Sequence, residues 1–210
     1  MRKHIIEKLQ SAMKERGWDA IVCCSPENYG YVTGFIVPSQ PLMRWRHAMA
    51  VIRADGTRAL LSVDMEASTV RKNAPGEVIQ VWKEFSYDAM DQLAVLLDKL
   101  ELSRGKIGIE MDYLPAGDFL ALAKRRSGIE WQPAEAVLAR LRQNKTQEEV
   151  ALLRRLSMIA DKAIAKAFES VEAGNTELDL AGALTRAVYD EGAEYFKLMI
   201  VATGERSILP

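Results

Sequence analysis

The stretch RLRQNKTQEEVALLRRLSMIADKAIAKAFESV, residues 140–171, carries the longest helical pattern in this 210-residue sequence. Thr146 is placed to cap a helix, and Glu149 follows three residues later, which is the spacing of a capping box. Apolar residues then recur at steps of three and four, at Leu152, Leu156, Ile159, Ala163, Ala167 and Val171. Charged residues fill much of the space between them. The pattern predicts an amphipathic helix with one buried face, ended at Gly174.

A second helix is predicted directly after the first. Thr176 and Asp179 repeat the capping spacing, apolar residues at helical intervals supply a buried face, and Gly192 is expected to end the helix. Residues 195–201, YFKLMIV, then predict a strand that is apolar on both faces. Because a single strand cannot satisfy its own backbone groups, this strand would need a sheet that the sequence does not contain.

Before residue 140 the pattern changes to short apolar strands that alternate with helices. Strands are expected at residues 19–24, 47–53, 58–63, 77–82, 106–110 and 129–131. Helices are expected at residues 5–16, 65–73, 86–100 and 114–126. Ser86 is expected to cap the helix at residues 86–100. The Asp55-Gly56 pair between two apolar runs is a strong hairpin signal, so two of the strands should be antiparallel. The alternation predicts an α/β domain with a mixed sheet.

Three segments resemble a known family when their order and spacing are taken together. They are residues 140–150 (RLRQNKTQEEV), residues 174–177 (GNTE) and residues 200–210 (IVATGERSILP). They resemble the opening of the catalytic domain of the creatinase and Xaa-Pro peptidase family, which has the pita-bread metallohydrolase fold. Residues 28–35, NYGYVTGF, resemble the family's Tyr-Leu-Thr-Gly-Phe pattern, and we interpret them as a tight glycine turn with Tyr31 and Phe35 in the core.

The resemblance implies a division of the chain. Residues 1–133 would form a mixed-sheet, creatinase-like N-terminal domain, and residues 134–145 would form a linker. Residues 146–210 would form the first part of an α+β pita-bread domain, incomplete in this sequence. In the family the metal ligands, two Asp, one His and two Glu, follow the segment that ends here at Pro210. The sequence therefore assigns no catalytic residue and no metal ligand.

The resemblance also implies a function. The chain is expected to be the N-terminal portion of a metal-dependent Xaa-Pro dipeptidase-like or aminopeptidase-like hydrolase that cleaves C–N bonds in small peptide or amide substrates. Its N-terminal domain would serve homodimerisation and substrate access. Mn, Co or Zn is expected in the full-length protein, and this chain alone is expected to bind no metal and to be inactive. The alternatives are a creatinase-type amidinohydrolase for a small carboxylated substrate and a non-catalytic, peptidase-like binding module.

Arg44 and Arg46 are the candidate substrate-binding residues. They flank Trp45 in a loop that begins with the proline-rich segment 38–41, and two guanidinium groups can hold a carboxylate in bidentate fashion. The resemblance places a loop at this position against the active site of the partner subunit. We therefore expect both arginines to act across a dimer interface.

Other polar residues offer weaker candidates. His4 and His47 lie far apart in the sequence, and His4 is expected to be solvated, so no metal-binding histidine pair is predicted. Two carboxylate pairs, within residues 64–66 and 110–112, follow predicted strands and are expected to be exposed in loops. Cys23 and Cys24 lie within a strand, where burial makes thiols inert.

The composition is that of an ordinary globular protein, with 49% hydrophobic and 27% charged residues and a formal net charge of −1. No basic tract indicates a nucleic-acid partner. No apolar run approaches the ~20 residues that span a bilayer, and the N-terminus lacks the apolar core of a secretory signal. Adjacent cysteines in a strand point to opposite faces and should not pair. We expect a cytoplasmic protein with neither nucleic-acid nor membrane partners.

Overall fold

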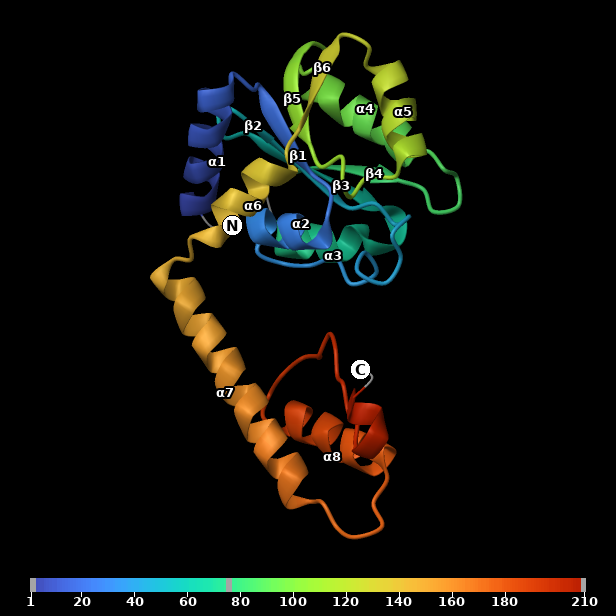
Figure 1. Ribbon diagram of the computed structural model, residues 1–210. Helices are drawn as coiled ribbons and strands as arrows, with labels where there is room; N and C mark the ends of the chain where they lie inside the picture. Colours follow the sequence, from blue (N-terminus) through green and yellow to red (C-terminus); the bar gives the residue numbers. More distant parts are fainter. Residues whose placement is uncertain (1–2, 75–76, 209–210) are drawn as a thin grey trace. The chain divides into compact units, whose positions relative to one another are not determined.

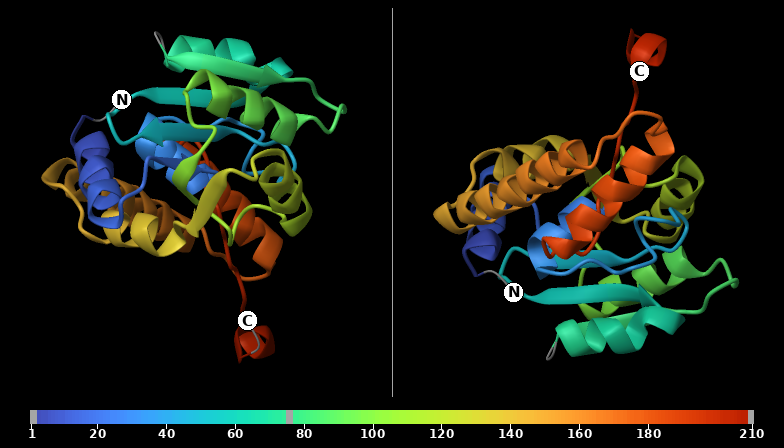
Figure 2. Two further views of the ribbon diagram at one scale, coloured as in Figure 1. Left: turned by 90° about the horizontal axis from the view of Figure 1, so that it is seen from above. Right: turned by 90° about the horizontal axis from the view of Figure 1, so that it is seen from below.

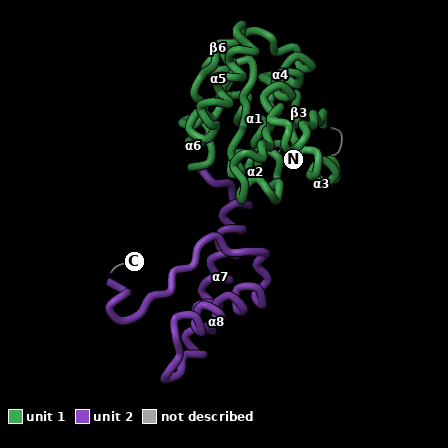
Figure 3. The backbone as a smooth tube through the Cα atoms, turned by 90° about the vertical axis from the view of Figure 1, so that its right-hand side faces the viewer, with its two compact units in different colours: residues 1–143 green, residues 144–210 purple. Residues whose placement is uncertain are grey.

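A computed structural model describes residues 3–74 and 77–208 of the chain. The chain divides into two compact units, Met1–Gln143 and Asn144–Pro210 (Figure 3).

The first unit is built on a six-stranded sheet in the order β4-β3-β2-β1-β5-β6 (Figure 1). The strands are β1 (Ala20–Cys23), β2 (Met49–Arg53), β3 (Arg58–Val63), β4 (Val78–Trp82), β5 (Gly105–Ile109) and β6 (Ile129–Pro133). β2 is antiparallel to β1 and to β3, and the other neighbouring pairs are parallel. The predicted α/β fold with a mixed sheet is therefore confirmed. The hairpin is also confirmed, since Gly56 takes a φ of 92° in the β2–β3 turn.

Helices cover both faces of this sheet, as Figures 1 and 2 show. One face carries α1 (Lys3–Arg16), α2 (Pro26–Thr33), α3 (Ala67–Asn73) and α6 (Glu135–Gln143), with the 3₁₀ turn η1 (Asp64–Glu66) leading into α3. The other face carries α4 (Ala89–Lys99) and α5 (Ala116–Arg125). Because successive strand residues point to opposite faces, the sheet supplies one half of two separate apolar cores.

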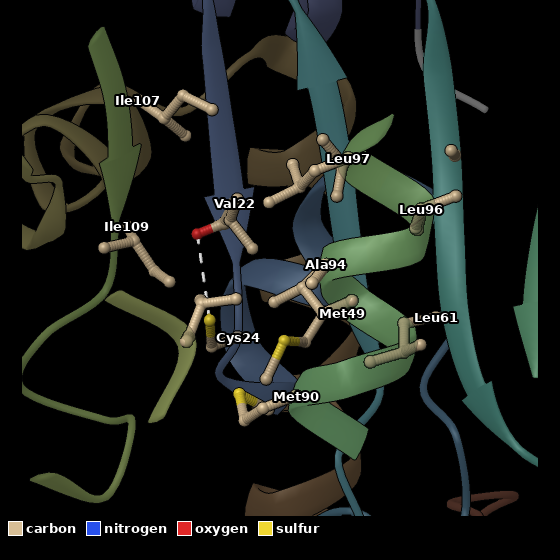
Figure 4. Packing of buried hydrophobic residues seen from close by; sticks show 14 of the residues in the cluster. Val22, Cys24, Met49, Leu61, Met90, Ala94, Leu96, Leu97, Ile107 and Ile109 are labelled. Carbon is tan, nitrogen blue, oxygen red and sulfur yellow. Dashed lines mark hydrogen bonds between the residues drawn. The ribbon is translucent and has the colours of Figure 1, made fainter. Parts of the chain in front are cut away.

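In the core beneath α4, one face of the helix packs against one face of the sheet. Met90, Ala94 and Leu97 recur along one face of α4 and pack over Val22 and Leu61 of the sheet (Figure 4). All five side chains are at most 4% exposed. Full burial of one large aliphatic side chain contributes roughly 1.5–3 kcal/mol, so this layer is a major source of stability.

Two local predictions in the first unit are wrong. Ser86 does not cap α4, because Phe85 and Tyr87 adopt left-handed backbone angles that a helix cannot contain, and Asp88 takes the N-cap position. Residues 28–35 are helical over most of their length, and a glycine turn forms only at Gly34. α2 continues through Thr33 and ends at Gly34, which has a φ of 86°. Tyr31 and Phe35 lie only partly buried against the core.

The expected linker belongs largely to the first unit. Residues 134–145 contain α6, and Val137 and Leu138 of this helix are buried in the core beside α1. Tyr31 also donates its hydroxyl hydrogen to the carbonyl of Leu141, at 3.2 Å. The first unit therefore runs to Gln143 rather than to the expected boundary at residue 133.

The second unit contains the two capped helices that the sequence predicts. α7 (Gln147–Glu169) begins with the predicted capping box of Thr146 and Glu149. α8 (Glu177–Asp190) begins with the equivalent box of Thr176 and Asp179. α7 ends at the C-cap Ser170 instead of Gly174, which lies in the following turn. A final 3₁₀ turn, η2, spans Gly204–Ile208, and residues 209–210 of the last motif lie outside the described residues.

Two long-range predictions in the second unit are wrong. Ala163 and Ala167 are buried, but Leu152 and Leu156 are 46% and 48% exposed, so only part of the expected apolar stripe of α7 is covered. Residues 195–201 form no strand, and no other described residue of this unit does. An isolated strand has no neighbour to take its backbone hydrogen bonds, so the segment adopts irregular structure instead.

Two of the motif segments nevertheless meet. Glu177 of the GNTE segment accepts a hydrogen bond from the backbone N–H of Thr203 at 2.8 Å and pairs with Arg206 at 3.0 Å. Within the described part of the chain, none of the helices combines the length and apolar character needed to cross a bilayer.

Gly108 provides a test of packing on β5. A Cβ atom placed there would lie 2.4 Å from the ring of Trp18, which is buried. We expect Gly108→Ala to lower the free energy of unfolding by about 1–3 kcal/mol, the usual cost of overpacking. Gly117→Ala is the matched control, because Gly117 lies on α5 with open space around it. The control should be neutral or stabilising by up to about 1 kcal/mol. Urea unfolding followed by circular dichroism measures both, and equal effects would contradict this packing.

Candidate functional site

Five strands finish at the same end of the sheet, where β2 begins: β1, β3, β4, β5 and β6. The chain passes from β1 through β2 and β3 to β4 in one direction, while β5 and β6 lie on the other side of β1. Open α/β sheets usually bind ligands outside the carboxyl ends of strands at such a point, where the strand order reverses. The polar residues between β1 and β5 therefore form the candidate site.

Glu110 occupies this position. It follows β5 directly, and its side chain is 2% exposed. Oε2 accepts hydrogen bonds from the backbone N–H groups of Cys24 at 2.5 Å and Ser25 at 3.0 Å, and Oε1 accepts one from the Asn28 side chain at 2.5 Å. Ser25 is the N-cap of α2, so the carboxylate lies at the positive end of that helix.

This arrangement corrects the prediction that Glu110 is an exposed loop carboxylate. A helix N-terminus attracts anions, and here the chain's own carboxylate takes the place that a bound anion could occupy. The sequence did hold a signal, since an acidic residue ends one buried strand and a Ser-Pro helix start follows another. These two features predict a buried carboxylate only when β1 and β5 are known to be neighbouring strands. Asp112 and Asp64 are exposed as expected, while Glu66 is partly buried and accepts a hydrogen bond from Ser39 N at 3.1 Å.

The two cysteines are buried, as expected for this strand. Burial raises the pKa of both thiols well above the ordinary value, and the negative charge of Glu110 raises each further. The Cys24 thiol lies 3.9 Å from the carbonyl oxygen of Val22, to which it donates (Figure 4). A neutral, enclosed thiol is a poor nucleophile, so neither cysteine offers covalent catalysis.

Thiol labelling tests this account. We expect Cys23 and Cys24 to react with a soluble disulfide reagent at pH 8 at least about a hundredfold more slowly than the same thiols in the denatured chain. The denatured chain should release the signal of both thiols and serves as the control. Rapid reaction of either thiol in the folded chain would show that burial does not suppress its reactivity.

The loop that carries Arg44 and Arg46 is anchored at its base by Gln40. This side chain is 1% exposed, and its amide donates to the backbone carbonyls of Cys24 at 2.7 Å and Ala48 at 2.8 Å. The backbone N–H of Cys24 donates to Glu110, so the loop and Glu110 are both attached to the turn between β1 and α2. Sequence reasoning missed Gln40, because nothing near it in the sequence indicates where its amide will bind.

Each of the two arginines contacts another loop of the same unit. Arg44 is exposed, donates to the Tyr113 carbonyl oxygen and lies 5.2 Å from the centre of the Tyr113 ring. Arg46 forms an ion pair with Glu84, and these two side chains are only 15% and 12% exposed. Trp45 between them is 62% exposed. The structure thus separates an exposed Arg44 from a largely enclosed Arg46, and substrate binding by either residue stays a prediction.

His47, at the end of this loop, is buried and bonded. Its Nε2 atom lies 2.9 Å from Oδ2 of Asp118 on α5, and its backbone carbonyl accepts from the Trp82 indole N–H at 2.8 Å. Burial lowers the pKa of His47, with Asp118 acting in the opposite direction. His4 is half-buried on α1 rather than solvated, and among the described residues its Nε2 atom has no hydrogen-bond partner.

The lowered pKa of His47 predicts a pH dependence of stability. Above about pH 6.5 the imidazole is neutral in both states, so it imposes no penalty. As the pH falls below that value the unfolded chain binds a proton that the folded chain does not, and the free energy of unfolding should fall by up to about 1.4 kcal/mol per pH unit. His47→Gln should flatten this slope, whereas the control His4→Gln should retain it. Urea titrations between pH 7.5 and 5.5 measure the slope, and an unchanged slope in His47→Gln would contradict the assignment.

The described residues do not form a metal centre. Across residues 3–74 and 77–208, no group of three or more His, Cys, Asp or Glu side chains could hold a metal ion. His47 and Asp118 provide one nitrogen and one carboxylate, which is fewer than the three protein ligands of a typical catalytic zinc site. The residues present therefore do not fit the divalent metal that the family resemblance implies.

The second unit contains an apolar cavity. It has a volume of about 500 Å³ and lies between α7, α8 and residues 196–203. Its lining is formed largely by aliphatic and aromatic side chains, including Ile164, Phe168 and Leu184. Thr203 brings a hydroxyl to this lining, but none of the described lining residues is an acid or a base that could activate it, so the cavity offers no hydrolytic machinery.

Comparison with known proteins relates this geometry to other chains. The family described as "Creatinase/Prolidase N-terminal domain" matches residues 5–144. The chain is 29% identical to the Xaa-Pro dipeptidase of Pyrococcus furiosus over 99% of its own length and 55% of that protein. It is 26% identical to the uncharacterized peptidase YqhT of Bacillus subtilis, covering 98% of this chain and 54% of the relative. The chain thus spans about half the length of the curated relatives it matches.

Solved structures share the fold. The prolidase from Pyrococcus furiosus superimposes with a TM-score of 0.76 at 24% identity, over 98% of this chain and 59% of that one. The N-terminal domain of the Xaa-Pro dipeptidase from Lactobacillus brevis gives a TM-score of 0.56 at 15% identity, over 64% of this chain and 98% of that one. At these identities the likeness establishes architecture alone.

Proposed function

Because this chain belongs to the creatinase/prolidase N-terminal domain family, we propose that it is the N-terminal portion of a metal-dependent Xaa-Pro dipeptidase-like or aminopeptidase-like hydrolase. The single observation that carries the proposal is the match of nearly the whole chain to an Xaa-Pro dipeptidase. The family is one of hydrolases, and its curated relatives include peptidases. The complete protein would cleave the C–N bond of small peptides and act in the cytoplasm as a homodimer.

The hydrolytic groups must then come from outside the residues described here. Amide hydrolysis by a metallohydrolase requires an activated water and a group that stabilises the developing oxyanion. Among residues 3–74 and 77–208, no cluster of side chains could hold a metal for either task. We propose that Mn, Co or Zn is bound by other parts of the complete protein, and that this chain alone does not hydrolyse peptides.

The first unit would contribute to dimerisation and substrate access. Arg44 is the better placed of the two candidate arginines, because it is exposed while Arg46 is enclosed against Glu84. Its planar guanidinium suits the carboxylate of a dipeptide. Its contacts with Tyr113 would restrict its rotamers before substrate arrives, which lowers the entropy lost on binding. We propose that Arg44 binds the substrate carboxylate across the dimer interface, and that Arg46 mainly holds the loop in position.

Kinetics of the complete protein test this proposal. Arg44→Ala should lower kcat/KM for Ala-Pro by roughly 1.5–3 kcal/mol in transition-state free energy, the usual worth of a hydrogen bond to a charged group. The same variant should cleave the Ala–Pro bond of Ala-Pro-NH2 almost as fast as the unmodified protein does, since this substrate has a C-terminal amide in place of the carboxylate. Arg104→Ala, an exposed arginine near the opposite edge of the sheet, is the control and should behave like the unmodified protein.

Other outcomes would separate the alternatives. Turnover of creatine without turnover of Ala-Pro would favour the amidinohydrolase. Absence of turnover by the complete protein with added Mn, Co or Zn would favour the non-catalytic binding module. Hydrolysis by residues 1–210 alone, above a control with metal only, would contradict the placement of the hydrolytic groups.

A further inference from the structure

Three buried polar atoms on one face of the first unit have no hydrogen-bond partner. They are the hydroxyl oxygen of Tyr29 on α2, Oγ of Ser39 in the loop before β2, and Oε2 of Glu66 in η1. Tyr29 is fully buried, and Ser39 is 7% exposed. Within residues 3–74 and 77–208, no group bonds to either hydroxyl or donates to Oε2 of Glu66. Leaving a buried polar atom unpaired is costly, so three of them together need an explanation.

The three atoms belong to one neighbourhood. The backbone N–H of Ser39 donates to Oε1 of Glu66 at 3.1 Å, so Oε2 is the oxygen of this carboxylate that stays unpaired. Tyr29 lies close enough to the carboxylate for its charge to act on the hydroxyl. Burial, and then the negative charge of Glu66, raise the pKa of Tyr29. Tyr29 therefore keeps its proton at neutral pH and can donate a hydrogen bond.

Local contacts fix the positions of these groups. The ring of Tyr29 meets the ring of Phe35 edge-on, with centroids 5.5 Å apart. The carbonyl of Ser39 accepts hydrogen bonds from the backbone N–H groups of Leu42 at 3.1 Å and Met43 at 2.9 Å, so Ser39 lies in an ordered turn. None of the three unpaired atoms bonds to another of the three. Whatever joins them must therefore be small and polar.

We propose that one ordered water molecule binds between Tyr29, Ser39 and Glu66. The water accepts a hydrogen bond from the Tyr29 hydroxyl, donates one to Oε2 of Glu66 and makes its third bond with Oγ of Ser39. A buried water typically makes about three hydrogen bonds to polar groups that otherwise have none. This site goes beyond the proposed peptidase function and does not depend on it.

The chemistry of the three oxygens suits water better than a metal ion. An ionised carboxylate only accepts hydrogen bonds, whereas each hydroxyl can donate and accept, so one water satisfies all three groups. Calcium takes about six to eight oxygen ligands, and magnesium demands near-octahedral coordination. Tyr29, Ser39 and Glu66 offer three unpaired oxygens and a single negative charge.

This water joins three segments at the base of the loop that carries Arg44. Tyr29 belongs to α2 and Glu66 to η1, both on the same face of the sheet (Figure 1). Ser39 directly precedes Gln40, which attaches the loop to the turn between β1 and α2. Water-mediated hydrogen bonds are nearly as favourable as direct ones. The water therefore supplies a second attachment of the loop, to α2 and η1.

A double-mutant cycle on the 210-residue chain tests whether a shared water links Tyr29 to Ser39. Tyr29→Phe and Ser39→Ala should each raise the equilibrium constant of unfolding about three- to tenfold. The double variant should fall short of the product of the two effects by at least about threefold, because the second change removes a partner of a water already lost. Urea unfolding followed by circular dichroism measures the constants, and the native spectrum checks that each variant is folded. Effects that multiply to within about twofold would overturn the proposal.

Tyr31→Phe is the matched control. Tyr31 lies on the same helix, but its hydroxyl donates directly to the carbonyl of Leu141 at 3.2 Å. Combined with Ser39→Ala, this change should give effects that multiply to within about twofold. An equally large shortfall in the control pair would assign the coupling to α2 as a whole and would overturn the shared water.

A high-resolution crystal structure of the chain identifies the bound species independently of stability. We expect one water peak at roughly 2.6–3.2 Å from the Tyr29 hydroxyl, Ser39 Oγ and Glu66 Oε2. A peak with six or more oxygen ligands at about 2.3–2.6 Å would identify a cation instead. That result, a direct hydrogen bond between Tyr29 and Glu66, or the absence of any peak would each overturn the proposal.

Discussion

The buried carboxylate of Glu110 is the interaction on which the functional edge of the first unit depends. A carboxylate removed from water costs several kcal/mol unless hydrogen bonds compensate it. Here two backbone N–H groups, one side-chain amide and the N-terminus of α2 provide that compensation. The requirement fixes the end of β5 against the β1–α2 turn. Gln40 then attaches the following loop to the carbonyl of Cys24, so the position of Arg44 depends on the same turn.

The residues at the carboxyl ends of the strands therefore hold a loop in position and do not form a ligand pocket. In many open α/β folds the corresponding crevice binds a ligand, but here Glu110 fills it. The loop above it is held from several sides, by Gln40 at its base, by Glu84 through Arg46 and by Asp118 through His47. What remains exposed is the tip. A rigid loop that displays a few side chains loses little entropy on binding, which suits a domain whose proposed task is to position substrate for another part of the protein.

The sequence predicted those features that depend on neighbouring residues. The Asp55-Gly56 turn and the capping boxes at Thr146 and Thr176 are local devices, and all three form as expected. The features it missed depend on contacts between distant residues. Glu110 is separated from Cys24 by 86 positions, and its burial follows from the pairing of β1 with β5, which no local pattern encodes. The packing of α6 onto α1 is another tertiary contact that no local pattern encodes, and it places residues 135–143 with the first compact unit.

In the second unit, the elements that depend on local sequence form, and the element that needs a distant partner does not. Capping and helical periodicity suffice to form α7 and α8, and small residues such as Ala163 and Ala187 allow these helices to approach. The apolar run at residues 195–201 had equally strong strand character but no neighbouring strand, and it stays irregular. Helical hydrogen bonds close within one segment, whereas strand hydrogen bonds need a second one. β4 shows the complementary case, since β3 supplies the neighbouring strand that residues 195–201 lack within the described part of the second unit.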